Sequence, residues 1–425
     1  MSTNTDEAGL ALAVNADNWQ LPPYTRGGYW HVGDILPTQR IAAPEKARAL
    51  PPAEGQPAAV DVSGVGLVRL DGRESTVGAV LADTYTDALV VLQDGALVTE
   101  WYGAEGAPNR THALMSVTKS VVGCVTAALV DRDLLDTDRP VTDFVPELAG
   151  SGYAGATVRN ILDMRSGVRF VEDYTDRDAD VWQIDEFPGG IYGYLCGLVA
   201  EAPHGERFMY RSAETDVLGW VCERVAGRPM AELIESFIWQ PMGAEFEAEI
   251  ICDTANVAWH DGGLCATARD MARFGQMLLD GGTVPAGDDV RTVIGPKWLR
   301  AAWAVDADIR SVFAASPNEA SMPGGWYRDQ FWFRPGSFGD TLLCLGIHGQ
   351  MIHVSRRTRT VCVKFSTWPE AQNPSYLQDT LRAFDNVGGA LGGRHSSVDR
   401  HRLPGIVSGA HRHGTADRPE EFHED

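Results

Sequence analysis

Apolar residues near both ends of the chain follow strand-like patterns. These runs cover residues 88–92, 96–102, 341–347, 351–354 and 360–365. The first two runs flank Asp94-Gly95, a dipeptide typical of a two-residue hairpin turn. Strands at both ends of a chain, with helices between them, favour one sheet to which both ends contribute. We therefore predict an α/β protein with an antiparallel sheet built from both termini and flanked by helices.

The middle of the chain follows helical spacing instead. Apolar residues recur there every three or four positions, in segments that end near glycine, proline or aspartate. The predicted helices cover residues 116–131, 158–164, 215–225 and 267–279, and another near 376–390 closes the fold. We therefore predict a mainly helical lobe inserted into the sheet domain, with the active site in a cleft between the two.

These patterns divide the chain into four parts. We assign residues 1–82 to an extended N-terminal arm, residues 83–136 and 300–391 to the α/β sheet domain, and residues 137–299 to the helical lobe. Residues 392–425 have little apolar content and five of the 11 histidines, so we predict a disordered tail. His411 and His413 could chelate a metal, but no ordered ligand spacing surrounds them. We predict no metal site and no cofactor.

The chain is strongly acidic, with a formal net charge of -22. This charge argues against nucleic-acid and anionic-membrane partners, and no apolar run reaches the ~18 residues of a membrane span. The acidity suits solubility, and steering of cationic substrates is the alternative interpretation. The seven cysteines include no C-x-x-C pair, and residues 1–7 do not resemble a signal peptide. We therefore predict a cytoplasmic protein that acts on small molecules, and the sequence leaves a homodimer open.

Lysine is rare in this chain, and one lysine lies in an apolar helix. Of the 36 basic residues only four are lysines, and Lys119 is flanked by valines, glycine and small polar residues. Ser116 lies three positions earlier, so both side chains share one face of the predicted helix. A hydroxyl beside an amine that can lose its proton is a nucleophile beside a base. The alternative interpretation is a helix-capping serine and a lysine that extends to solvent.

Two further segments carry candidate chemistry. Tyr210 comes just before the helix near residue 215, where its phenol could pass a proton to a leaving group; a packing tyrosine is the alternative. Gly346 to Gln350 is predicted to form a strand whose backbone N–H completes an oxyanion hole with that of Ser116. The alternative there is a β-bulge. The sequence contains no Gly-x-Ser-x-Gly elbow, no His-Glu-x-x-His and no phosphate loop.

The order of these elements resembles the serine β-lactamase and penicillin-binding superfamily, which includes family VIII esterases. Within it, five blocks resemble the 6-aminohexanoate-dimer hydrolases, nylon-oligomer amidases that also have esterase activity. The blocks begin at residues 114, 140, 215, 266 and 346, and the likeness covers about residues 18–390. The resemblance implies a serine β-lactamase-like fold and an acyl-enzyme mechanism.

The resemblance also implies roles for individual residues. Ser116 would be the nucleophile, Lys119 its base and Tyr210 the proton-transfer partner, with an oxyanion hole formed by the backbone N–H groups of Ser116 and Ile347. Substrate contacts would come from residues of the pocket, namely Tyr174 on a closing loop, Asp185 opposite a substrate ammonium, Asp261 and His348. Where β-lactamases have Lys-Thr-Gly, this chain has His348-Gly349-Gln350, so we expect no strong β-lactamase activity.

We therefore predict a serine hydrolase that cleaves small linear amides or esters. In this prediction, burial and neighbouring groups depress the pKa of Lys119, so that its neutral amine accepts the Ser116 proton. Two alternatives stay open. One is a short-chain carboxylesterase without a real amidase role, and the other is a non-hydrolytic binding or sensing protein on the same scaffold.

Overall fold

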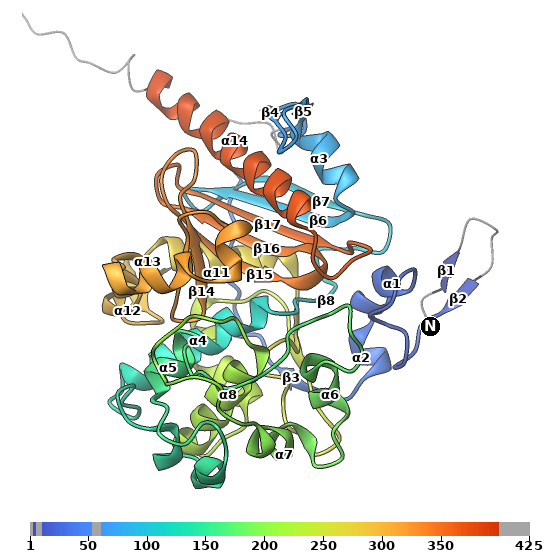
Figure 1. Ribbon diagram of the computed structural model, residues 1–425. Coiled ribbons are helices and arrows are strands. Elements are labelled where there is room, and N and C mark those ends of the chain that lie inside the picture. Colours follow the sequence, from blue (N-terminus) through green and yellow to red (C-terminus); the bar gives the residue numbers. More distant parts are fainter. Residues whose placement is uncertain (1–2, 6–10, 53–60, 399–425) are drawn as a thin grey trace, which may run out of the picture.

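The computed structural model describes residues 3–5, 11–52 and 61–398, and its centre is a seven-stranded antiparallel sheet (Figure 1). In spatial order the strands are β13 (Trp326–Arg328), β14 (Phe331–Arg334), β15 (Thr341–Gly346), β16 (Gln350–Ser355), β17 (Thr360–Ser366), β6 (Thr86–Gln93) and β7 (Ala96–Tyr102). Asp94 and Gly95 both have positive φ angles, 48° and 80°, as the tight hairpin turn requires. The predicted sheet from both termini is confirmed.

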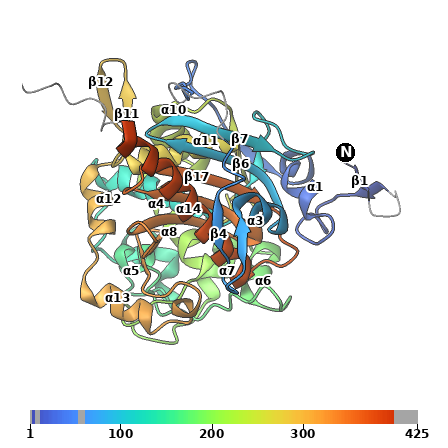
Figure 2. The same cartoon turned by 90° about the horizontal axis from the view of Figure 1, so that it is seen from above.

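Alternate residues of the central strands face two different cores. On one face, Val90 and Val363 pack in the core shared with helices α4 (Val117–Val130) and α11 (Ala268–Leu279). On the other face, Leu89 and Cys362 pack with helices α3 (Val77–Asp83) and α14 (Pro374–Val398). The sheet is therefore covered by helices on both sides (Figures 1 and 2), which explains why its strands are almost continuously apolar.

Most of the remaining helices gather on the α4 side of the sheet. They are α5 (Val158–Leu162), α6 (Asp180–Glu186), α7 (Gly190–Gly197), α8 (Ser212–Ala226), α9 (Met230–Ile234) and α10 (Gln240–Met242). Helix α8 packs against α4 and ends where Gly227 takes a left-handed conformation. The division into a sheet domain and a helical lobe stays a prediction, and α11, which lies within residues 137–299, packs on the sheet.

A second, four-stranded sheet brings two distant segments together. Its order is β3 (Thr38–Ile41), β9 (Ala248–Ile251), β10 (Leu264–Ala266) and β8 (His112–Ala113). Strands β8 and β10 are antiparallel neighbours, with Ala113 opposite Cys265. Because Ser116 follows β8 and Asp261 precedes β10, this pairing places the two residues at the same edge of the sheet.

The other elements lie at the periphery. They are the strand pairs β1 (Thr3–Thr5)–β2 (Ala11–Ala13), β4 (Gly66–Val68)–β5 (Glu74–Thr76) and β11 (Thr283–Ala286)–β12 (Asp289–Thr292), and the helices α1 (Thr25–Tyr29), α2 (Val32–Ile35), α12 (Pro296–Trp303) and α13 (Ala307–Ala314). The predicted extended arm is therefore wrong in part, since turns and short helices follow residue 15. Trp19 and Tyr29 are buried there, so contact with the core overrides the weak local periodicity.

Helix α14 continues to Val398, beyond the predicted end near residue 390. Residues 392–398, assigned to a disordered tail from the sequence, are therefore helical, and the rest of that tail lies outside the described residues. The glycines of this helix do not stop it. A Cβ on Gly388 would lie 2.7 Å from Thr358 Oγ1, and one on Gly389 would lie 2.3 Å from the Phe338 ring. Glycine thus allows close packing of the helix on the sheet.

The turn between β13 and β14 joins the sheet to the helices around the site. Asp329 and Gln330 both have positive φ angles, 54° and 68°. The Gln330 backbone carbonyl accepts a hydrogen bond from Ser120 Oγ of α4 (2.8 Å), and its side-chain Oε1 accepts one from Thr215 Oγ1 of α8 (2.8 Å). Its Nε2 donates to the carbonyl of Leu162 at the end of α5 (3.2 Å). We call Asp329 and Gln330, together with these hydrogen bonds, the β13–β14 clamp.

Within the described ranges, none of the helices combines the length and the apolar character that a membrane crossing demands.

Candidate active site

Ser116 lies on a tight elbow between β8 and α4. The preceding residue, Met115, has a φ of 49°, a left-handed conformation that is uncommon outside glycine. Thr118 holds this elbow, because its Oγ1 donates to the Met115 carbonyl (2.7 Å) and accepts from the Leu264 N–H of β10 (3.0 Å). The elbow presents Ser116 at the N-terminal end of α4, where the helix dipole favours a developing negative charge.

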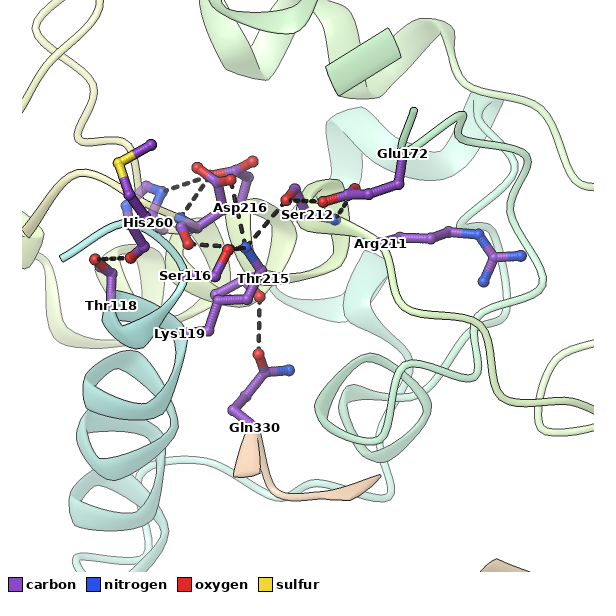
Figure 3. Close-up of polar contacts among 12 residues, drawn as sticks. Ser116, Thr118, Lys119, Glu172, Arg211, Ser212, Thr215, Asp216, His260 and Gln330 are labelled. Carbon is purple, nitrogen blue, oxygen red and sulfur yellow. Dashed lines mark hydrogen bonds and ion pairs between the residues drawn. The ribbon is translucent and has the colours of Figure 1, made fainter. Parts of the chain in front are cut away.

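Lys119 contacts Ser116 directly, as helical spacing predicts. Its Nζ lies 2.9 Å from Ser116 Oγ, 3.0 Å from Ser212 Oγ and 2.8 Å from the Asp261 backbone carbonyl (Figure 3). The side chain is only 1% exposed. An ammonium has three N–H donors, and here each of them has an acceptor.

The predicted neutral Lys119 is wrong for the resting protein. Burial by itself lowers the pKa of Lys119, but the electrostatic influence of Tyr210, followed by Asp261, Glu172 and Asp216, outweighs it and raises the pKa above its ordinary value. Among these groups, the Asp261 carboxylate lies 3.4 Å from Nζ, and Glu172 and Asp216 act from further away. The apolar helix around the lysine predicts a lowered pKa, whereas the groups that raise it come from other segments of the chain.

The Glu172 carboxylate, which was not predicted as a site residue from the sequence, organises the other side of Lys119. Glu172 accepts hydrogen bonds from the Ser212 N–H (2.8 Å) and Ser212 Oγ (2.7 Å), and also from the Tyr174 hydroxyl (2.7 Å). Ser212 therefore donates to Glu172 and accepts from Lys119, so one hydroxyl links the two charges. Ser212 is the last residue of Tyr210-Arg211-Ser212, and this segment was the only sequence signal for the network.

The structure brings Tyr210 to the same place. Tyr210 lines the same cavity as Ser116, its ring centroid lies 5.3 Å from Lys119 Nζ, and burial raises the pKa of the phenol. The ring packs against Trp332 with the centroids 5.0 Å apart. The phenol is thus held in its neutral form, in reach of the serine.

The Gly346–Gln350 segment is a turn rather than the predicted strand. Strand β15 ends at Gly346, Ile347–Gly349 forms one turn of 3-10 helix, and β16 begins at Gln350. A Cβ on Gly346 would lie 2.5 Å from the Leu114 carbonyl oxygen. Glycine therefore lets this turn approach the elbow closely and places Ile347 beside Ser116, on the walls of the same cavities.

His348 is not part of the site. Its side chain is buried and absent from both cavity walls, its Nδ1 lies 2.7 Å from the Trp368 carbonyl, and its ring packs on Tyr29. Its φ of 57° differs from that of a regular strand, and its side chain lies against Trp368 and Tyr29 instead of the cavities. The predicted substrate contact of His348 is therefore corrected to a structural role in the turn.

Two cavities open on either side of Ser116, and Tyr174 and Ile347 line both of them. The wide cavity (≈ 160 Å³) is walled by Tyr210, Trp332 and Trp368, with Asn318 and Gln372 among its polar residues. The side chains that line the narrow cavity (≈ 40 Å³) and not the wide one include Trp182, Trp259 and Asp261. Among the described residues that line the two cavities, Asp261 is the one with a charged side chain. The side chain of Asp185, on α6, lies outside the described residues.

A buried ion network supports the Asp261 segment from behind. The Asp261 N–H donates to Asp216 Oδ1 (3.2 Å), and His260 lies between Asp216 (3.8 Å) and Glu223 (3.4 Å). Burial by itself lowers the pKa of His260, but these two carboxylates raise it to about 9. A Cβ on Gly219 would lie 2.1 Å from the imidazole, so that glycine makes room for the ring. Neither Asp216 nor His260 had a recognisable sequence signal.

Among the described residues, no group of three or more histidine, cysteine, aspartate or glutamate side chains is arranged to hold a metal ion. His411 and His413 of the tail lie outside these residues.

Comparisons with known proteins agree with this geometry. The β-lactamase family profile matches residues 73–383. The chain is 34% identical over 388 residues to a 6-aminohexanoate-dimer hydrolase from Paenarthrobacter ureafaciens, covering 87% of this chain and 94% of that protein. It is 30% identical over 181 residues to an esterase from Burkholderia gladioli, covering 37% of this chain and 44% of that protein.

A solved structure from Bacillus anthracis, titled as a 6-aminohexanoate-dimer hydrolase, superposes with a TM-score of 0.78 at 23% identity. The superposition covers 89% of this chain and 96% of that one, and it shows a shared fold. The family match and the 34% identity over most of the chain show that this protein belongs to the β-lactamase family, as a serine hydrolase related to 6-aminohexanoate-dimer hydrolase.

Proposed function

We propose that this enzyme is an amidase with esterase activity, that it acts on small linear substrates with a free amine at one end, and that it forms an acyl-enzyme on Ser116. The observation that carries the proposal is the 2.9 Å contact between Ser116 Oγ and the buried Lys119 amine, at the junction of the two cavities. A serine paired with a buried amine is the arrangement that activates a hydroxyl without an Asp-His pair.

In this mechanism Lys119 first releases one proton to solvent water, because its resting ammonium form cannot accept another. The neutral amine then takes the proton of Ser116, directly or through the Tyr210 hydroxyl. The serine oxygen attacks the substrate carbonyl, and the backbone N–H groups of Ser116 and Ile347 stabilise the oxyanion. Tyr210 returns the proton to the leaving amine or alcohol, and water attacks the acyl-enzyme by the same route.

The narrow cavity supports the preference for an amine-bearing acyl chain. Asp261 supplies a carboxylate there, and Trp182, Trp259 and Tyr174 supply aromatic faces that also attract cations. The net charge of -22 favours approach of a cation over that of an anion. In this proposal Tyr174 and Asp261 contact the substrate, and Asp185 stays a candidate for the ammonium contact on the basis of the family resemblance alone.

A carboxylesterase without amidase activity is the second candidate. The walls of the wide cavity favour it, because Tyr210, Trp332 and Trp368 form an aromatic surface suited to an uncharged acyl or alkyl group. A non-hydrolytic binder is disfavoured, because Tyr210 next to Ser116 serves proton transfer and a binder needs none.

The deciding experiment is release of 6-aminohexanoate from its linear dimer by the purified protein, with p-nitrophenyl butyrate assayed alongside and Ser116→Ala as control. Cleavage of the dimer that depends on Ser116 supports the amidase. Cleavage of the ester alone supports the esterase, and turnover of neither contradicts both.

We also propose a cytoplasmic location. The seven cysteines are all free and six are buried, which suits a reducing compartment. A homodimer stays a proposal from the sequence, and sedimentation of the purified chain tests it.

A further inference from the structure

The described wall of the wide cavity is uncharged, although the cavity lies next to the charged Lys119. None of its described lining side chains is charged. Its inner wall is apolar and aromatic, with Trp332, Met351 and Trp368, and carboxamides contribute much of the polarity of the rest of the wall.

Two of those carboxamides are available to a ligand. Gln350 is committed to the fold, because its Nε2 donates to the Ser366 carbonyl (2.6 Å) and its Oε1 accepts from the Ser366 N–H (3.2 Å). Asn373 is also committed, because its Oδ1 caps α14 at the Tyr376 N–H (3.0 Å). The side-chain amides of Asn318 and Gln372 make no hydrogen bond within the described part of the chain.

The catalytic lysine does not supply the missing cation. Its three N–H donors are directed at Ser116, Ser212 and the Asp261 carbonyl, and the Asp261 carboxylate already offsets its charge. A substrate carboxylate in the wide cavity would therefore lose water without gaining a cation, whereas a carboxamide or ester would meet aromatic walls and two free amides.

We propose that the wide cavity is a subsite for the leaving side of the substrate and that it selects an uncharged end group, a carboxamide or an ester, over a free carboxylate. This inference rests on the proposed function, because it assigns the amine-bearing acyl side to Asp261 and the narrow cavity. The preferred substrate is then a linear amide or ester with an ammonium at the acyl end and a neutral polar group at the other.

The test uses two matched pairs of substrates. The amide pair is the linear 6-aminohexanoate dimer and the same dimer with its carboxylate converted to a carboxamide, followed by chromatography of the products. The ester pair is 6-acetoxyhexanoate and 6-acetoxyhexanamide, followed as acetic acid release. Within each pair we expect kcat/KM to be about tenfold or more higher for the neutral member, the size expected when a polar group stays unpaired.

Two variants locate the selection in the wide cavity. Asn318→Lys and Gln372→Lys each place a cation at its wall and should reduce the preference to about threefold or less. Asn318→Met is about as long as the lysine variant but removes the amide without adding a charge, so it should reduce the preference less than Asn318→Lys does.

Each outcome decides between the two proposals. A preference in the ester pair with an inert amide pair would contradict the amidase and leave this inference standing. Equal kcat/KM within both pairs, or a preference that neither lysine variant reduces, would overturn the inference while leaving the amidase. Absence of Ser116-dependent turnover of all four compounds would overturn both.

Discussion

Asp261 contacts the Lys119 ammonium twice, through its carboxylate at 3.4 Å and through its backbone carbonyl at 2.8 Å. The backbone contact fixes the position of the amine, and the carboxylate stabilises its charge. The two effects separate on substitution, because asparagine removes the charge and keeps the backbone. Asp261 therefore contributes to the pH at which the base becomes available, in addition to any contact with substrate.

Asp261→Asn should shift the acid limb of the pH profile to lower pH. The carboxylate favours the protonated lysine, so its removal lowers the pKa of Lys119, and the neutral amine forms at lower pH. We expect a shift of about one pH unit, since the carboxylate is partly exposed. The measurement is kcat/KM on uncharged p-nitrophenyl butyrate from pH 5 to 10. The raised pKa of Lys119 places this whole range on the acid limb, so the shift appears as a roughly tenfold higher kcat/KM of the variant at each pH. A limb that stays in place or moves to higher pH would show that this carboxylate does not control the base.

Lys119→Arg should lower kcat by about a hundredfold or more. Arginine keeps its proton at every accessible pH, so it cannot accept one from Ser116. Lys297→Arg is the matched control, because that lysine is exposed and distant in sequence from the site residues. Wild-type rates in Lys119→Arg, with the thermal melting point unchanged, would exclude the lysine as base.

Gly346→Ala should reduce kcat by roughly 10- to 100-fold with a smaller effect on KM. The added Cβ would lie 2.5 Å from the Leu114 carbonyl oxygen, so the turn carrying Ile347 must move away from Ser116. Gly66→Ala is the matched control, since nothing lies within 4 Å of the Cβ position there. Ester hydrolysis by both variants tests the prediction, and equal rates would remove Ile347 from the oxyanion hole.

Two buried basic residues, His260 and Lys364, should oppose each other in the pH dependence of stability. The pKa of His260 is raised to about 9, so between pH 6.5 and 9 the folded state holds a proton that the unfolded state has lost, and stability falls as pH rises. Burial lowers the pKa of Lys364 to about 7, so above pH 7 the unfolded state holds the extra proton, and stability rises with pH. The two slopes nearly cancel between pH 7 and 8.

Substitution of either residue reveals the pH dependence of stability that the other residue contributes. Between pH 7 and 8 the free energy of unfolding of His260→Gln should rise by about 1 kcal/mol, and that of Lys364→Met should fall by about the same amount. Urea denaturation at both pH values measures the change, and the comparison within each variant removes its overall loss of stability. If the free energy of unfolding changed with pH in the same direction in both variants, the prediction that the two residues oppose each other would be wrong.

The sequence correctly predicted the features that depend on a single helix or a single turn. Ser116 and Lys119 meet because helical spacing places them on one face, and the turn at Asp94-Gly95 follows from the need for positive φ angles. The charge of Lys119 could not be predicted, because Asp261 and Glu172 reach it from other segments of the chain. Periodicity contains no information on such contacts between distant segments.

The buried ion network behind the site could not be predicted for the same reason. Asp216 and His260 belong to different elements, and only the folded chain shows that they share a proton-binding network with Glu223. The helix that ends at Val398 shows a related limit. Its glycines resemble stop signals in the sequence, and the sheet beneath them explains their presence.

The β13–β14 clamp has a consequence for how this enzyme can diversify. Gln330 bonds to α4, which carries Lys119, and to α8, which begins at Ser212, so the distances among the reacting groups depend on one turn whose own residues line neither cavity. Asn318 and Gln372 lie outside these bonds. Insertions and substitutions around them can therefore accumulate without disturbing the chemistry, and new substrate ranges can arise on an unchanged catalytic frame.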